Sequence, residues 1–185
     1  PFTAVEHLGT HDTPRLLTML VRPGHRRAKT TGQRTAQPGG AGHGTAAAGA
    51  GALLLYSFPG SPTVFYGDEA GMQGFEDPLN RGTYGGQEDP ALLAYFRQLG
   101  TLRKQRVSLQ CGDIGYLYAG AGLVLRRQSE DEVTVAAMNA GIQPLELSIP
   151  WSGALAKDAL TGQHFFARNG MLRLTLPPVG GVLLV

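Results

Sequence analysis

The spacing of hydrophobic and polar residues changes near Val107. Before this residue, short strand-like runs alternate with helical patterns. Apolar and β-branched residues predict strands over 2–8 and 63–66, and apolar residues at helical spacing predict helices over 13–20 and 90–106. The first part of the chain therefore repeats a strand, a loop and a helix twice.

After Val107 the period falls to two residues. Alternating segments separated by short polar or glycine-containing turns are typical of a small antiparallel sandwich. We expect a domain boundary here, with residues 1–107 as one part and residues 108–185 as a β-sandwich domain. Trp151 and Phe165–Phe166 are assigned to core or edge packing. The alternating segments are 122–127, 132–138, 145–149, 171–176 and 181–185.

Residues 21–51 interrupt the first part with a stretch rich in Gly, Ala, Pro and basic residues. It has few large apolar side chains, so we expect an irregular low-complexity insertion. Its basic residues also permit a nucleic-acid-binding arm, although no aromatic side chain for base stacking lies among them. These basic residues are Arg22, Arg26, Arg27, Lys29 and Arg34.

The amino-acid composition limits the classes of protein to which the chain can belong. The chain has 185 residues, 42% of them hydrophobic and 16% charged, so most of it can bury a core. Its apolar runs are too short to span a bilayer, and no signal peptide is visible. One cysteine, Cys111, excludes an internal disulfide framework or a cysteine-based metal cluster. We expect a cytoplasmic protein without a cofactor or metal site, and with neither a nucleic-acid nor a membrane partner.

Both predicted strands of the first part end in polar residues. His11 and Asp12 follow the first strand, and Asp68 and Glu69 follow the second. The loops after the strands build the active site of a (β/α)8 barrel, which needs about 250 residues. The sequence thus predicts an α/β part, the last two strand–helix units of a TIM barrel, followed by an all-β sandwich. Alternatively, Thr10 or Asp12 is the cap of the following helix, with a proline in its first turn.

Four stretches carry a resemblance to a known family. In order, the chain reads LGTHDTPRLL over 8–17, FPGSPTVFYGDEAGM over 58–72, EDPLNR over 76–81 and EDPALLAYFRQLGTLRK over 88–104. Together with the trailing β domain, this series resembles the C-terminal part of the α-amylase family, glycoside hydrolase family 13. The branch containing neopullulanases, cyclomaltodextrinases and α-glucosidases is the most similar.

The resemblance implies roles for particular residues. Asp12 would be the third active-site carboxylate, a transition-state stabiliser, and His11 would bind a neighbouring sugar hydroxyl. Asp77 and Arg81 would bind the next glucose on the non-reducing side, although a surface ion pair is an equal alternative for them. Because Asp68 and Glu69 alternate across the strand end, at most one faces the cleft. We expect a structural role for Glu69 and leave Asp68 unassigned.

The resemblance also implies the substrate and the chemistry. The family is retaining: a nucleophilic aspartate and a general-acid glutamate lie about 5–5.5 Å apart. Both come from earlier strands, and this chain contains neither region. The sequence therefore predicts a C-terminal fragment of an α-glucan-cleaving glycoside hydrolase acting on maltodextrins, with calcium left open. The alternative is a non-catalytic remnant or a carbohydrate-contacting structural fragment.

Overall fold

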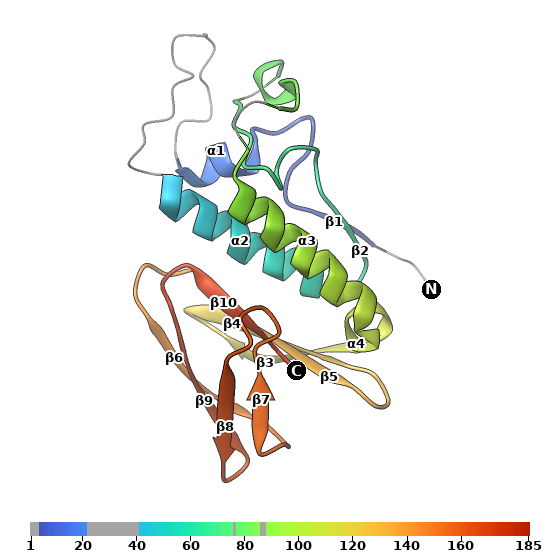
Figure 1. Cartoon of the computed structure of the whole chain (residues 1–185), viewed down its shortest axis with the longest axis vertical. Helices are drawn as coiled ribbons and strands as arrows, with labels where there is room; N and C mark the ends of the chain where they lie inside the picture. The colour runs from blue at the N-terminus through green and yellow to red at the C-terminus, as the bar shows by residue number, and fades with distance from the viewer. Residues whose placement is uncertain (1–3, 22–40, 76, 86–87) are drawn as a thin grey trace.

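A layer of helices and two antiparallel four-stranded sheets lie one on another in the computed structural model (Figure 1). The structure describes residues 4–21, 41–75, 77–85 and 88–185. The helices come from the first part of the chain and the two sheets from the second, in the order that the periodicity predicts.

The first part contains two short parallel strands. Strands β1 (Val5–His7) and β2 (Ser61–Thr63) pair in parallel, with Val5 opposite Ser61 and His7 opposite Thr63. Their carboxyl ends therefore point the same way and bring the following loops together. The helical elements are α1 (Leu16–Val21), α2 (Ala41–Ser57), the 3-10 turn η3 (Leu79–Arg81), α3 (Pro90–Gln105) and α4 (Val107–Cys111).

The prediction of an irregular stretch over 21–51 is wrong for residues 41–51, which form the first part of α2. Alanine has the highest helix propensity, and small side chains let neighbouring elements approach the helix closely. A Cβ atom at Gly51 would lie 3.2 Å from a methyl group of Leu8, and one at Gly49 would lie 3.6 Å from the Tyr95 ring. The small residues thus let Leu8 and Tyr95 pack directly against this part of the helix. Residues 22–40, with the basic side chains, lie outside the described residues.

Helix α3 forms as its sequence predicts. The Asp89 carboxylate accepts hydrogen bonds from the backbone N–H groups of Ala91 and Leu92, each at 3.0 Å, and Pro90 occupies the first turn. The buried face of the helix carries Leu92, Phe96, Leu99, Leu102 and Arg103. Among the described residues, no helix has both the length and the apolar composition needed to cross a bilayer.

The second part forms an antiparallel sandwich, as the alternation predicts. One sheet has the order β10-β5-β4-β3 and the other the order β6-β9-β8-β7. The sequence pattern missed β3, β7 and β8. The strands are β3 (Asp113–Ala119), β4 (Gly122–Gln128), β5 (Val133–Asn139), β6 (Leu145–Pro150), β7 (Leu155–Lys157), β8 (His164–Arg168), β9 (Met171–Leu176) and β10 (Gly180–Leu184).

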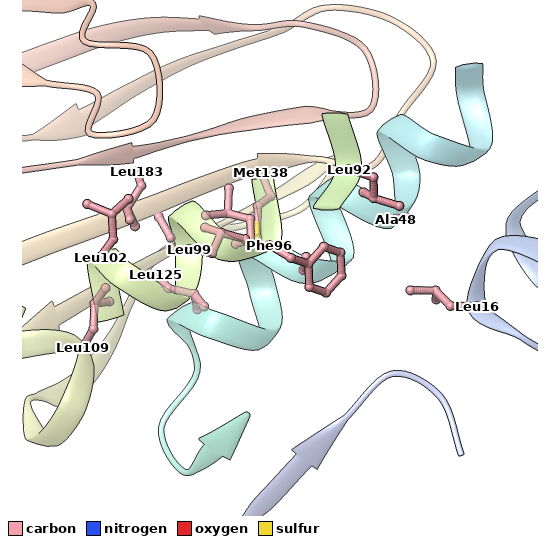
Figure 2. Packing of buried hydrophobic residues seen from close by; sticks show 13 residues of the cluster. Leu16, Ala48, Leu92, Phe96, Leu99, Leu102, Leu109, Leu125, Met138 and Leu183 are labelled. Carbon is pink, nitrogen blue, oxygen red and sulfur yellow. The ribbon is translucent and has the colours of Figure 1, made fainter. Parts of the chain in front are cut away.

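The first of these sheets is buried on both faces. Alternate side chains of β4, β5 and β10 enter two different apolar clusters, because neighbours along a strand point to opposite faces. Figure 2 shows the cluster shared with the helices, where side chains of α3 lie beside those of the sheet. The helix-facing residues of the sheet are Leu125, Ala136, Met138 and Leu183. The residues facing the second sheet are Val124, Val135, Ala137, Val182 and Leu184.

The aromatic residues of the sandwich divide into two groups. Trp151 and Phe165 pack against the core between the sheets, as expected. Phe166 does not: it lies on the outer face of β8 and is 75% exposed. The boundary near residue 107 stays a prediction. Since the helices cover one face of the first sheet, residues 108–185 alone would expose that face.

Two buried arginines secure the carboxyl end of α2 to the rest of the fold. Arg103 of α3 donates hydrogen bonds to the carbonyl oxygens of Tyr56, Phe58 and Gly60 at 2.6–3.0 Å. Arg127 of β4 donates to the carbonyl oxygen of Ser57 at 2.9 Å. Positive charge at this helix end also interacts favourably with the helix dipole.

We predict that Arg127→Met destabilises the chain by about 3 kcal/mol, because the guanidinium also donates to the carbonyl oxygen of Gly112 and is only 1% exposed. The measurement is the free energy of unfolding in urea. Arg126→Met, at the exposed neighbouring position of β4, is the matched control and should change stability by less than about 0.5 kcal/mol. Equal effects of the two substitutions would contradict the role of Arg127.

Candidate functional site

The loop after β1 folds into a tight turn around two threonines. The backbone N–H of Thr10 donates to Thr13 Oγ1 at 3.1 Å, and that of Asp12 donates to Thr10 Oγ1 at 3.2 Å. This turn leaves the side chains of His11 and Asp12 61% and 74% exposed. Among the described residues, the Asp12 carboxylate accepts no backbone hydrogen bond from α1, so the geometry does not favour the helix-cap alternative.

The loop after β2 brings two further predicted residues to the same place. Arg81 Nε lies 2.6 Å from Asp77 Oδ1, and another nitrogen of the same guanidinium lies 4.0 Å from Asp12 Oδ1. His11 Nε2 lies 3.3 Å from Asp12 Oδ2. The structure therefore brings all four predicted site residues together, with Asp12 between His11 and Arg81.

Asn80 joins these two loops below the exposed side chains. Its side chain is fully buried, and its Nδ2 donates to the carbonyl oxygens of His11 and Thr13 at 2.7 and 2.9 Å. Tyr66, three residues after β2, donates from its hydroxyl to the carbonyl oxygen of Gly82 at 3.0 Å. The loop carrying Arg81 is thus attached to both strand ends.

A buried ion pair lies beneath the site. The side chains of Arg15 and Asp68 are 0% and 4% exposed, and Arg15 lies 3.5 Å from Asp68 Oδ1. Arg15 also donates to the carbonyl oxygen of Tyr66, and its guanidinium lies 4.3 and 4.4 Å from the ring centres of Phe65 and Tyr66. Arg15 follows β1 and Asp68 follows β2, so this pair connects the two strand ends.

The Asp68 carboxylate occupies space that only glycine leaves free. A Cβ atom at Gly9 would lie 2.5 Å from Asp68 Oδ2. Burial raises the pKa of Asp68 to about 6, although the neighbouring Arg15 charge acts in the opposite direction. Asp68 is therefore buried beneath the exposed residues His11 and Asp12 and contacts Arg15.

Glu69 is held within its own turn, where its carboxylate accepts a hydrogen bond from the backbone N–H of Gly67 at 2.8 Å. Its structural role stays a prediction. The sequence reasoning missed Arg15 and Asn80, and it left Asp68 unassigned. Both missed residues lie inside the stretches HDTPR and EDPLNR, so their presence in the motifs was the available signal.

The exposed groups form a surface suited to a ligand rich in hydroxyl groups. Asp12 and Asp77 offer carboxylate acceptors, and Arg81 offers several N–H donors in a planar arrangement. Within the described ranges, no group of three or more His, Cys, Asp or Glu side chains is arranged to hold a metal ion.

Several known proteins are similar to this chain in sequence and in fold. The cyclomaltodextrinase of Geobacillus thermopakistaniensis is 32% identical over 184 residues, covering 95% of this chain and 28% of that protein. The amylopullulanase of Thermoanaerobacter thermohydrosulfuricus is 28% identical over 202 residues, covering 100% of this chain and 13% of that protein. No protein-family model matches the chain.

The chain is homologous to the C-terminal part of α-amylase-family glycoside hydrolases. A crystal structure of an Anoxybacillus α-amylase has the same fold, with a TM-score of 0.81 and 24% identity over 98% of this chain and 37% of the other. The chain spans less than a third of the length of the curated α-amylase-family relatives named above.

The buried carboxyl group of Asp68 makes the stability of this chain depend on pH. Because the pKa of Asp68 is about 6 in the folded chain and about 3.9 in an unfolded one, the folded state binds the proton more tightly. The resulting stabilisation is complete below about pH 4 and is lost as the pH rises through about 6. We predict that wild-type stability falls by about 2–3 kcal/mol between pH 4 and 7 relative to Asp68→Asn.

This difference can be measured by urea unfolding of both proteins across that pH range. Asp131→Asn, at an exposed position, controls for the removal of one carboxyl group. The opposite result, a wild-type stability that rises with pH relative to Asp68→Asn, would contradict the prediction. It would mean that the attraction of Arg15 for the ionised carboxylate exceeds the cost of burying that charge.

Proposed function

We propose that this chain supplies the sugar-binding part of the active site of a retaining α-glucan-cleaving glycoside hydrolase. The observation that supports the proposal best is the position of Asp12. Its exposed carboxylate lies between His11 and Arg81, at the carboxyl end of a parallel strand. The relatives named cyclomaltodextrinase and amylopullulanase suggest an α-glucan or maltodextrin as the ligand.

In this proposal each exposed residue has a distinct contact with the sugar. Asp12 accepts hydrogen bonds from ring hydroxyls of the glucose at the cleavage point, and His11 donates to a neighbouring hydroxyl. Arg81 donates to the adjacent glucose, with Asp77 holding the guanidinium and accepting a further hydroxyl. Hydrogen bonds to ring hydroxyls strengthen as the oxocarbenium-like transition state forms, so Asp12 accelerates the reaction through that difference.

The first part of the chain, in this proposal, is the end of a (β/α)8 barrel. Parallel strands β1 and β2, each followed by helical elements, support two consecutive barrel units. A groove of about 960 Å³ between β2 and α3 also supports it, because a further strand and its side chains would fill such a space. Apolar residues lining this groove include Pro62, Val64, Leu93 and Phe96.

The nucleophile and the general acid come, in this proposal, from polypeptide outside the 185 residues. The aspartate and glutamate of a retaining pair lie about 5–5.5 Å apart. In this proposal the carboxylates of Asp12 and Asp77 bind the sugar, beside His11 and Arg81 respectively, and do not form that pair. The second candidate, a carbohydrate-contacting fragment without catalysis, uses the same residues, and it is favoured by the absence from this chain of the motifs that carry the pair.

We predict that the purified chain hydrolyses neither maltotriose, pullulan nor cyclodextrin, because its binding residues have no reacting pair to assist. Product formation is measured by release of reducing sugar over a long incubation. The cyclomaltodextrinase relative is the positive control on cyclodextrin. Turnover by the chain within tenfold of that control would contradict the assignment of the catalytic pair to residues outside it.

In a polypeptide that joins this chain to the preceding barrel strands, Asp12→Asn should lose most of kcat while KM changes little. A contact made mainly in the transition state gives this pattern, whereas a contact made equally in the ground state raises KM. Steady-state kinetics on maltotriose distinguish the two. Arg81→Met is the comparison, and its main effect should be on KM. An unchanged kcat for Asp12→Asn would remove Asp12 from the active site.

A further inference from the structure

Asn80 is a buried polar residue in an exposed loop. Asp77, Arg81 and Tyr84 around it are exposed, whereas Asn80 itself is 0% exposed. A buried side-chain amide is costly unless it is hydrogen-bonded, so its contacts define why it is there. Both of its N–H groups are used, and both bond to the backbone of the other loop.

We propose that Asn80 is a positioning residue for sugar binding: it sets the separation between Asp12 and Arg81. This inference rests on the proposed function for the identity of the ligand. The two carbonyl groups that Asn80 contacts belong to His11 and Thr13, the residues on either side of Asp12. One side chain therefore fixes the backbone on both sides of the carboxylate.

The same residue fixes the partner of that carboxylate. Arg81 follows Asn80 directly in η3, and its guanidinium is held at 2.6 Å by Asp77 of the same loop. Arg81 therefore moves with η3. Because Asn80 attaches η3 to the turn that carries Asp12, the distance of 4.0 Å between Asp12 and Arg81 depends on this amide.

Asparagine is suited to this position for a chemical reason. Two carbonyl oxygens need two donors, and the amide nitrogen supplies both N–H groups. Its Oδ1 is buried with no hydrogen-bond partner among the described residues, so reversing the amide would place that oxygen against two carbonyl oxygens. An ionised aspartate has the same shape and no donor, and it would repel both carbonyl groups.

The chain contains a matched control for this substitution. Asn139 of β5 is 1% exposed, and its Nδ2 also donates to two carbonyl oxygens, those of Gln143 at 2.7 Å and Pro177 at 3.0 Å. It lies in the β-sandwich, in a different part of the fold from the β1 loop. Asn139→Asp removes the same pair of contacts and therefore controls for a general loss of stability.

The experiment compares Asn80→Asp with Asn139→Asp in the full 185-residue chain. Two readouts are used: the affinity for maltotriose by calorimetry, and hydrogen exchange of residues 9–13. The backbone carbonyl ¹³C resonances of His11 and Thr13 report directly on the two hydrogen bonds. We expect Asn80→Asp to weaken maltotriose binding about tenfold and to speed exchange over 9–13, with both resonances shifted. Asn139→Asp should leave all three unchanged.

Other outcomes separate the two proposals. If wild-type chain does not bind maltotriose, the proposed sugar site fails, and exchange over 9–13 still tests the positioning role. If Asn80→Asp leaves exchange and both resonances as in the wild type, the positioning role is overturned. If Asn80→Asp does not fold, Asn80→Ala replaces it, and unchanged exchange in that variant has the same meaning.

Discussion

The candidate site depends on the buried contact between Arg15 and Asp68. Arg15 belongs to the segment that leaves β1, and Asp68 belongs to the segment that leaves β2. Their contact, together with the hydrogen bond from Arg15 to the Tyr66 carbonyl, joins the two strand ends in the interior. Gly9 completes this arrangement, because any larger residue there would overlap the Asp68 carboxylate. The exposed residues His11 and Asp12 lie on this buried support.

The β-sandwich contributes to the same support from the opposite side. Helices α2 and α3 lie against one face of its first sheet (Figure 1). In the chain, α2 precedes β2 and α3 follows it, so the sheet holds the helices on both sides of this strand. Arg103 and Arg127 strengthen this connection at the carboxyl end of α2. The trailing β domain is therefore part of the framework behind the site, although it carries none of the four predicted site residues.

Much of the fold and of the candidate site could be predicted from the sequence. The features that the sequence predictions missed have physical reasons. The exposed site residues were recognisable because they stand in short motifs that resemble those of a known family, and His11 and Asp12 also follow a predicted strand. Arg15 and Asp68 were harder, since an arginine and an aspartate in a loop are usually exposed and only tertiary packing buries them. Helix α2 was missed over 41–51 because its stability comes from close contact of small residues, which periodicity does not show. Strand β8 was missed because Phe165 and Phe166 are adjacent and point to opposite faces.

The central claim is that the loops after β1 and β2 form one sugar-binding site. A double-mutant cycle tests it most directly. In the polypeptide that joins this chain to the preceding barrel strands, kcat/KM on maltotriose is measured for wild type, Asp12→Asn, Arg81→Met and the double variant. Two residues that contact one ligand and each other give non-additive losses, whereas independent residues give additive ones. The account predicts that the double variant loses clearly less of kcat/KM, expressed as a free energy, than the two single losses combined. Strictly additive losses, or no loss in either single variant, would contradict it.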